Sequence, residues 1–392
     1  MTKAHIEQLV SGADTAQAVR HVFCPYRVCP LGAHVDHQHG LVTGFALDKG
    51  ISFDFIATED GVVEVFSSDY DGSAVGSVHE AHERQYTWVD FIFGAVATLK
   101  KSYHIERGFR GIVRGSLPVG GLSSSASVIL TYLMAFAEVN DIVLTPPELV
   151  QLAIDEERNY IGVNVGKLDQ SCEVYCRKDN LLYLDTLSDS AKLIPISRKM
   201  PPFEIAVFFS GVGRKLAGSA YNMRVDECKA AAYALKDFAR LEYGKFSDTY
   251  LRDVPQGIFD QHKGQLPPSW AKRAEHFYGE NARVKKGVRA FMEGDIYTFG
   301  RLMFESGWSS IQLYQTGSAE LKTLHEIMTQ TDGIYGGRFS GAGFNGCAMA
   351  LVAPDKSESI ARHVGDAYLT AFPHLEGKFS VHFCRTSDGI RL

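Results

Sequence analysis

The stretch from residue 115 to residue 127 constrains the chain most, because it combines two glycines with three consecutive serines: G-S-L-P-V-G-G-L-S-S-S-A-S. A β-prone run precedes it at residues 109–113, and an apolar run follows it at residues 128–139. The chain order therefore predicts a strand, a glycine-serine turn and a helix start. Such a turn gathers backbone N–H groups at the positive end of a helix, where phosphate binds well. One serine would be enough to cap the helix, so three serines behind two glycines favour a phosphate site.

The composition is that of an ordinary globular protein. The 392 residues are enough for two domains. Hydrophobic residues make up 45% of the chain and charged residues 22%, which is typical of soluble proteins. The formal net charge of -6 gives no support for a nucleic-acid partner.

The cysteines and the apolar segments indicate where the protein works. The seven cysteines are scattered and odd in number, which favours free thiols in a reducing compartment. The longest apolar stretch, residues 128–139, is too short to cross a bilayer. The polar residues 1–22 are typical of an amphipathic helix and not of a secretory signal. We therefore expect a cytoplasmic protein without a membrane partner, and the oligomeric state stays open.

A second stretch, within residues 23–50, gathers charged and imidazole side chains. It begins F-C-P-Y-R-V-C-P-L-G-A-H-V-D-H-Q-H-G, and its prolines and glycines predict a loop between strands. One interpretation is a metal site of the form H-x-D-H-x-H, and a polar substrate loop is the favoured one. The side chains concerned are Arg27, His34, Asp36, His37 and His39.

Periodicity places the elements around these motifs. Residues 86–102 have apolar residues at helical spacing, and residues 145–160 begin with a capping box and a proline at the first helical position. This second helix ends in Asp155, Glu156 and Glu157, which are unfavourable against the helix dipole. A bound cation would compensate, although a solvated face is the alternative.

The second half of the chain is predicted in the same way. The polar stretch 188–202 is taken as the boundary between two domains, 1–195 and 196–392. Asp169 follows a glycine turn and is either a helix cap or a working group. Strands are expected at 46–65 with a turn at 60–61, at 181–184 and at 203–209, helices at 221–241, 271–292 and 296–306, and a loop at 256–270.

A third motif lies at residues 335–354, Y-G-G-R-F-S-G-A-G-F-N-G-C-A-M-A-L-V-A-P. Its G-x-G-x-x-G is not a dinucleotide fingerprint, because a strand and not a helix follows it. The chain has no G-K-[ST] of a P-loop and none of the H-R-D and D-F-G motifs of protein kinases.

In their order and spacing, the three motifs resemble those of the GHMP small-molecule kinases, and the chain is most similar to the galactokinase branch. Further matches are residues 157–170, S-G-S-A-Y-N-M-R-V-D-E-C around Tyr221, and F-G-R-L-M-F-E-S at residues 299–306. The chain departs from that branch in several places. Its second motif is one residue shorter, Tyr26 replaces a glycine, and Gly307 stands where histidine is usual.

The resemblance implies a two-domain α+β fold, with an N-terminal domain like ribosomal protein S5 domain 2 and a ferredoxin-like C-terminal domain. It implies transfer of the γ-phosphoryl group of ATP to the anomeric hydroxyl of a sugar. Asp169 matches the catalytic aspartate and Arg27 its partner arginine. Glu157 matches a ligand of Mg²⁺, and Ser125 is the expected second ligand, with Ser124 as the alternative. The implied nucleotide-binding residues are Gly120, Gly121, Leu122, Ser123, Ser124 and Ser125.

The resemblance also bears on the sugar. His34, Asp36 and Tyr221 match residues that bind sugar hydroxyls, but galactokinases have glutamate where this chain has Ala33. That glutamate would repel a carboxylate at C6, whereas alanine tolerates it. Lys167, with His37 and His39, would supply positive charge.

The first motif is similar to that of plant-type galacturonokinases, so we expect phosphorylation of D-galacturonate to galacturonate 1-phosphate. A galactokinase, an L-arabinokinase and a sugar-sensing regulator without turnover are the alternatives. The regulators typically lose part of the phosphate loop or a catalytic residue, and Arg27, Asp169 and Glu157 are all present here.

Overall fold

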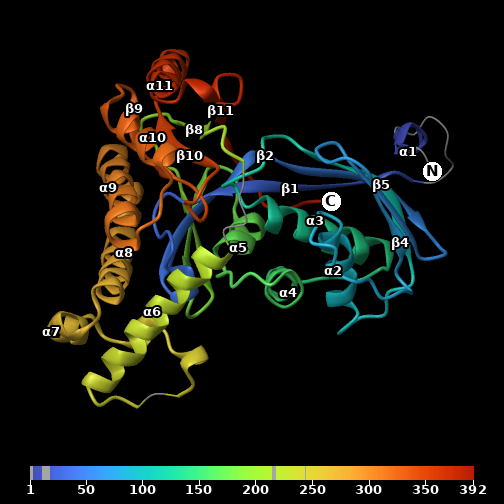
Figure 1. Cartoon of the computed structure of the whole chain (residues 1–392). Coiled ribbons are helices and arrows are strands. Elements are labelled where there is room, and N and C mark those ends of the chain that lie inside the picture. The colour runs from blue at the N-terminus through green and yellow to red at the C-terminus, as the bar shows by residue number, and fades with distance from the viewer. Residues whose placement is uncertain (1–2, 11–17, 214–217, 243) are drawn as a thin grey trace.

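The protein is built around two β-sheets (Figure 1), seen here in a computed structural model that describes residues 3–10, 18–213, 218–242 and 244–392. Within these residues, the larger sheet has eight strands. Six follow the order β4-β3-β5-β2-β6-β7, and β1 and β12 also pair with β2. The smaller sheet has the order β11-β8-β10-β9. This arrangement agrees with the expected α+β class.

The long strand β2 (Leu41–Thr58) is the spine of the larger sheet. It pairs with β1 (Arg20–Val28) on one edge and with β5 (Gly108–Gly115) and β6 (Asn180–Asp185) on the other. The remaining strands are β3 (Val62–Ser67), β4 (Ser73–Ser77), β7 (Ser190–Pro195) and β12 (Thr386–Ser387). The predicted turn at residues 60–61 is confirmed, because β2 ends and β3 begins around it.

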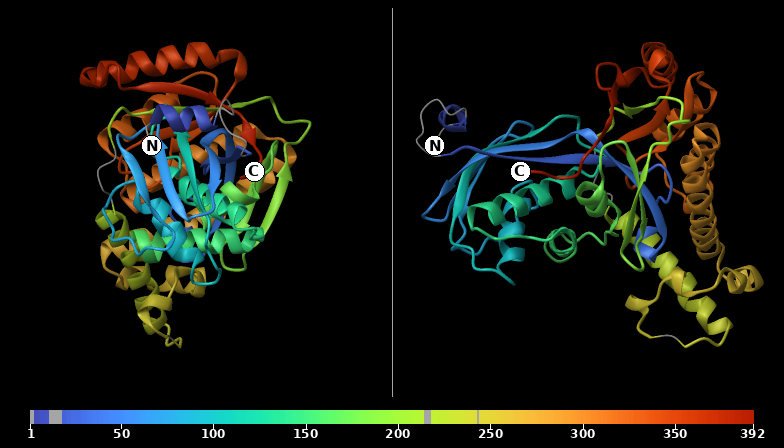
Figure 2. Two further views of the ribbon diagram at one scale, coloured as in Figure 1. Left: turned by 90° about the vertical axis from the view of Figure 1, so that its right-hand side faces the viewer. Right: turned by 180° about the vertical axis from the view of Figure 1, so that it is seen from behind.

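Helices cover one face of this sheet (Figure 2). The central one is α3 (Ser124–Val139), which packs against β1 and β2 and is buried along most of its length, as its apolar sequence predicts. It is flanked by α2 (Asp90–Leu99) and α4 (Pro146–Glu156), and α5 (Leu168–Tyr175) packs against its N-terminal part. A short helix, α1 (Lys3–Val10), contacts β5.

The smaller sheet is ferredoxin-like, as expected. Its strands are β8 (Glu204–Phe209), β9 (Ile334–Phe339), β10 (Cys347–Val352) and β11 (Ser380–Cys384). All three neighbouring pairs are antiparallel, and helices follow β8 and β10, which is a β-α-β-β-α-β pattern. Its helices are α6 (Gly218–Phe238), α7 (Gln256–His262), α8 (Pro268–Glu293), α9 (Ile296–Ser309), α10 (Ala319–Gln330) and α11 (Ser357–Ala371).

Two sequence predictions near the N-terminus need correction. The helix expected over residues 1–22 covers only α1, because residues from Arg20 belong to β1 and residues 1–2 and 11–17 lie outside the described part of the chain. The loop expected from residue 23 starts only after Val28. Pro25 is accommodated inside β1 because the pairing with β2 shifts register between Pro25 and Arg27. Such a bulge tolerates a proline that would break a regular strand.

The loop expected at residues 256–270 was also wrong. It contains helix α7, and Pro268 is the first residue of α8 and not part of a loop. Proline suits that position, because the first N–H groups of a helix have no partner within it.

The predicted boundary stretch 188–202 contains strand β7, paired with β6, so the chain leaves the larger sheet only after Pro195. The division into 1–195 and 196–392 stays a prediction, and β12 returns to the larger sheet at the end of the chain. Among the described residues, no helix has both the length and the apolar character needed to cross a membrane.

Candidate active site

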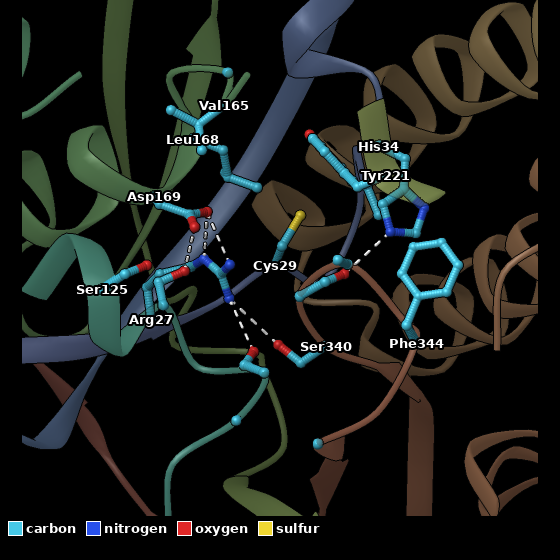
Figure 3. A pocket seen from close by; sticks show the side chains of 18 of the residues that line it. Arg27, Cys29, His34, Ser125, Val165, Leu168, Asp169, Tyr221, Ser340 and Phe344 are labelled. Carbon is cyan, nitrogen blue, oxygen red and sulfur yellow. Dashed lines mark hydrogen bonds and ion pairs between the residues drawn. The ribbon is translucent and has the colours of Figure 1, made fainter. Parts of the chain in front are cut away.

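Arg27 is the side chain that joins the predicted motifs (Figure 3). It follows the bulge in β1, and bulges of this kind redirect the next side chain. Its Nε and Nη2 atoms each lie 2.8 Å from Asp169 Oδ1. Its Nη1 donates to Gly121 O at 3.3 Å and to Ser340 Oγ at 3.4 Å. One guanidinium thus connects the larger sheet, the serine turn, α5 and the third motif.

Electrostatics keep Arg27 charged. The side chain is almost fully buried, and burial by itself lowers the pKa of a guanidinium. The charge and hydrogen bond of Asp169 outweigh this effect, so the pKa of Arg27 is raised overall. The cation is therefore fixed opposite the carboxylate.

Asp169 lies in the first turn of α5, with its side chain 27% exposed. Its Oδ1 atom is held by Arg27, and its Oδ2 atom accepts a hydrogen bond from Ser123 Oγ. Ser123 directly precedes α3 and has a φ of 62°, in the left-handed region. The strand, turn and helix predicted around residues 115–127 are confirmed, and the turn contacts the carboxylate directly.

Ser125 and Glu157 meet beside this turn. The Ser125 Oγ atom donates to Glu157 Oε1 at 2.9 Å, and Gln170 Nε2 donates to Glu157 Oε2 at 2.7 Å. Glu157 is buried and begins a π-helical turn, Glu157–Ile161, that continues α4. The acidic end of this helix therefore turns a carboxylate inward, toward the serine turn.

The serine turn and the third motif pack backbone against backbone. A Cβ atom on Gly346 would lie 2.8 Å from the carbonyl carbon of Gly120, and one on Gly341 would lie 3.0 Å from Gly121 Cα. Both Gly341 and Gly346 also have positive φ angles. Any side chain there would push the two turns apart, which explains why both motifs are rich in glycine.

His34 faces the cavity from the loop after β1. Its Nε2 atom lies 3.0 Å from Gly341 O, and its ring stacks on Tyr314 at a centroid distance of 4.6 Å. Burial, followed by the charge of Arg338, lowers the pKa of His34, so the ring is neutral. Because a carbonyl only accepts, Nε2 carries the proton and Nδ1 is an acceptor. That Nδ1 atom has no hydrogen-bond partner among the described residues.

Asp36 and Ala33 complete this side of the site. The Asp36 Oδ2 atom accepts a hydrogen bond from Leu168 N at 3.2 Å, and Gly166 packs so closely on this carboxylate that a Cβ atom would overlap it. Burial, and then the charge of Asp169, raises the pKa of Asp36. The Ala33 backbone carbonyl accepts from His276 Nε2 of α8 at 2.9 Å.

These residues line one cavity of about 220 Å³. Among the predicted site residues, the lining contains Arg27, Ala33, His34, Asp36, Gly120, Gly121, Ser123, Ser124, Ser125, Glu157, Asp169 and Tyr221. Leu122 is not in the lining, because its side chain is buried in the core and its carbonyl accepts from Arg27 N at 3.3 Å.

The three side chains expected to supply positive charge to a uronate, namely Lys167, His37 and His39, bring no positive charge to the cavity. Lys167 is not among the lining residues, and its Nζ atom pairs with Asp189 Oδ1 at 2.6 Å. His37 bonds to the Tyr314 hydroxyl, and burial, followed by His276, lowers the pKa of His37 to about 3. His39 stacks on a tyrosine outside the cavity, and burial lowers its pKa also. Both histidines are thus neutral, and the loop supplies no imidazolium.

The sequence reasoning missed Arg338, which lies on β9 and lines the cavity. This buried arginine donates to Ser306 Oγ at 2.6 Å and to Ser310 Oγ at 3.1 Å. Its Nη1 atom is 3.9 Å from the buried carboxylate of Glu280. The sequence did contain a signal for this residue, because Arg338 is a charged residue in an otherwise uncharged strand, two positions before Ser340. Other lining residues that were missed are Cys29, Ser340, Phe344 and Asn345.

Two metal sites were considered from the sequence, one in the histidine-rich loop and one at Ser125 and Glu157, and the side chains present favour the second. Among the described residues, no group of three or more His, Cys, Asp or Glu side chains could hold a metal ion, so the H-x-D-H-x-H interpretation fails. Magnesium is usually held by one or two carboxylates, phosphate oxygens and water. The Ser125 hydroxyl and the buried Glu157 carboxylate, which meet in the cavity wall, fit that requirement.

Comparison with known proteins agrees with this geometry. The sequence patterns described as GHMP kinases N terminal domain and GHMP kinases C terminal match residues 90–177 and 288–370. The chain is 35% identical to a galacturonokinase of Arabidopsis thaliana, over 98% of this chain and 95% of that protein. It is 32% identical to a galactokinase of Roseiflexus sp. (strain RS-1), over 94% and 92% of the two chains.

A solved structure agrees over the whole length. The galactokinase of Lactococcus lactis, complexed with galactose, superposes with a TM-score of 0.88 at 28% identity and covers 99% of this chain and 98% of that chain. The mevalonate kinase of Methanococcus jannaschii shares the fold at a TM-score of 0.65. The chain therefore belongs to the GHMP kinases, in the branch that includes the galactokinases and the galacturonokinase.

Proposed function

We propose that the protein is an ATP-dependent sugar 1-kinase that phosphorylates the anomeric hydroxyl of D-galacturonate. The observation that carries this proposal is the shared cavity. It brings the Arg27–Asp169 pair, the serine turn and Ala33 together in one lining. The similarity to a galacturonokinase and to galactokinases supports the same reaction.

In this proposal, Asp169 is the general base. Its carboxylate accepts the proton of the anomeric hydroxyl as that oxygen attacks the γ-phosphorus, and the bond to the bridging oxygen of ADP breaks. Arg27 and Ser123 hold the two oxygens of Asp169, so the base is oriented before substrate binds. Arg27 also counters the charge on the transferred group.

The serine turn binds the nucleotide. The backbone N–H groups around Gly120 and Gly121 and the start of α3 suit the phosphates. Ser125 and Glu157 would hold Mg²⁺, which neutralises phosphate charge when it is bound. Ser124, which also lines the cavity, is the alternative serine ligand.

The opposite end of the cavity binds the sugar. His34 offers an acceptor at Nδ1, and Asp36 and Tyr221 also line the cavity, so the three suit sugar hydroxyls. Ala33 places no negative charge there. Among the lining residues of the described chain, the cations are Arg27, which Asp169 neutralises, and Arg338, which shares the single carboxylate of Glu280 with Arg283. Arg338 is therefore our candidate for the partner of the C6 carboxylate, in place of Lys167.

We also infer that the protein works in the cytoplasm. All seven cysteines are free and buried. Free thiols are typical of a reducing compartment.

The proposed reaction is tested by identifying the product. The protein is incubated with ATP, Mg²⁺ and D-galacturonate, and the products are followed by phosphorus NMR. We expect ADP and a phosphate ester coupled to the anomeric proton. An ester at another carbon, or ADP formed without any sugar phosphate, would contradict the proposal.

A further inference from the structure

Glu173 is a fully buried carboxyl group close to the proposed base. It lies four residues after Asp169 on α5, so the two side chains share one face of that helix. Its Oε1 atom lies 2.8 Å from Ser127 Oγ on α3. Its Oε2 atom has no hydrogen-bond partner among the described residues. A buried carboxylate with so few donors is unfavourable.

The hydroxyl of Ser127 has more acceptors around it than it can serve. Besides Glu173, Ser127 Oγ lies 3.2 Å from the carbonyl oxygens of Ser123 and Pro25. A hydroxyl has one proton, and a carbonyl oxygen only accepts. If Glu173 were ionised, it would take that proton and neither carbonyl would receive it. If Glu173 carries a proton, it donates to Ser127 Oγ, and the Ser127 proton is free for the backbone carbonyls of Ser123 and Pro25, each at 3.2 Å.

We propose that Glu173 is held as a neutral carboxylic acid and acts as a positioning residue, donating through Ser127 to the backbone of Ser123. The backbone of Ser123 is in the left-handed region, which costs energy for a serine. Its side chain contacts Asp169, so a support for this backbone fixes the proposed base. The kinetic part of the inference rests on the proposed kinase function.

The charges around Glu173 favour the protonated form. Asp169 faces it from α5 and Glu157 from the π-helical turn, and both are acidic. From β1, it meets Arg27, which is already paired with Asp169, and the buried side chains of Cys24 and Tyr26. On α3 its partner is Ser127, and the C-terminal segment brings only the backbone N–H of Ile390, which donates to Glu173 O. Burial first, and then Asp169, raises the pKa of Glu173 well above its usual value.

Infrared spectroscopy reads the protonation state directly. The difference spectrum between the wild-type protein and Glu173→Gln is expected to show the C=O stretch of a protonated carboxyl. The symmetric and antisymmetric bands of a carboxylate would overturn the inference. This measurement needs no turnover, so it remains decisive even if the proposed function fails.

Kinetics test the positioning role. Glu173→Gln keeps a donor for Ser127, and we expect kcat and KM within about twofold of the wild-type values. Glu173→Leu removes the donor, and we expect kcat to fall about tenfold or more with a smaller change in KM. Ser127→Ala should cause a similar loss, and the double variant should be no worse than either single one.

Glu156→Gln is the matched control. Glu156 is also fully buried, and neither of its carboxyl oxygens has a hydrogen-bond partner among the described residues, but its carboxylate lies against Gly94 of α2. Its substitution should leave kcat and KM unchanged. A folded Glu173→Gln variant that loses as much activity as Glu173→Leu would overturn the positioning role.

Discussion

The guanidinium of Arg27 contacts Asp169 Oδ1 through both Nε and Nη2, each at 2.8 Å, although 142 residues separate the two along the chain. The double contact fixes one oxygen and leaves the other to Ser123 and the cavity. The carboxylate is therefore oriented without substrate, which lowers the cost of reaching the reactive geometry.

Asp169→Asn keeps the shape of the side chain and removes the base. We expect kcat to fall about 100-fold to 10,000-fold, because a positioned base contributes this much. Binding of nucleotide and of galacturonate, measured by calorimetry, should stay close to wild type. Asp155→Asn, at a surface position bonded to Gln151, is the control and should be fully active. A rate near wild type in Asp169→Asn would exclude this residue as the base.

Ala33→Glu tests whether residue 33 reads the C6 group. The new carboxylate would face that of galacturonate, and like charges in a desolvated site cost several kcal/mol, so we expect kcat/KM for galacturonate to fall on the order of 100-fold. Galactose should be much less affected. Ala33→Gln has the same size without the charge and should keep most of the activity on galacturonate. Equal losses on both sugars would show that residue 33 does not face C6.

Ser125→Ala removes one proposed ligand of the metal. Because Ser125 and Glu157 meet at 2.9 Å, we expect the Mg²⁺ concentration for half-maximal activity to rise about tenfold. Glu157→Gln should raise it in the same direction. If Ser124→Ala causes this change and Ser125→Ala does not, the alternative serine is the ligand.

The lowered pKa of the buried Glu280 carboxyl group should make the stability of the protein depend on pH. The Glu280 carboxylate accepts from Gly32 N at 2.8 Å and pairs with Arg283 at 2.7 Å. Burial alone would raise the pKa of Glu280, but Arg283, then His276 and Arg338, lower it to about 2. Because the pKa of Glu280 is lower in the folded protein than its ordinary value of 4.5, the ionised carboxylate stabilises the fold. This contribution to the free energy of unfolding is complete above pH 4.5 and is lost as the pH falls toward 2.

The variant Glu280→Gln should therefore be less stable than wild type at neutral pH, by about 3 kcal/mol. That difference should shrink as the pH falls from about 4.5 toward 2. Urea unfolding at a series of pH values measures it. Glu275→Gln, at an exposed position on the same helix, is the control and should show no such trend. A constant difference across this pH range would contradict the role of Glu280.

The sequence predicted those parts of the site whose conformation depends on neighbouring residues in the chain. The glycines and serines of residues 115–127 specify their own turn, and the glycines near Gly341 allow a second turn to pack against it. The pairing of Arg27 with Asp169 was expected from the family resemblance. For the acidic helix end, a bound cation and a solvated face were the alternatives, and the burial of Glu157 excludes a solvated face at this residue.

Other features of the site depend on contacts between residues that are far apart in the sequence, and these were not predicted. Lys167 directly precedes α5, two residues before Asp169, yet its ammonium group pairs with Asp189 outside the cavity. Gly307, where the related kinases usually have histidine, is covered by the ring of His325, whose Cε1 atom would lie 2.3 Å from a Cβ atom at position 307. Neither partner is near in sequence, so no periodicity or spacing could indicate them.

The most direct test of the account is the kcat/KM of the wild-type protein with ATP and each of four sugars, D-galacturonate, D-galactose, L-arabinose and D-glucuronate, at matched concentrations. The account predicts that D-galacturonate is phosphorylated with the highest kcat/KM. A kcat/KM for D-galactose that exceeds it by about tenfold or more would contradict the assigned substrate, and a failure to consume ATP with any of the four would contradict the proposed sugar kinase activity itself.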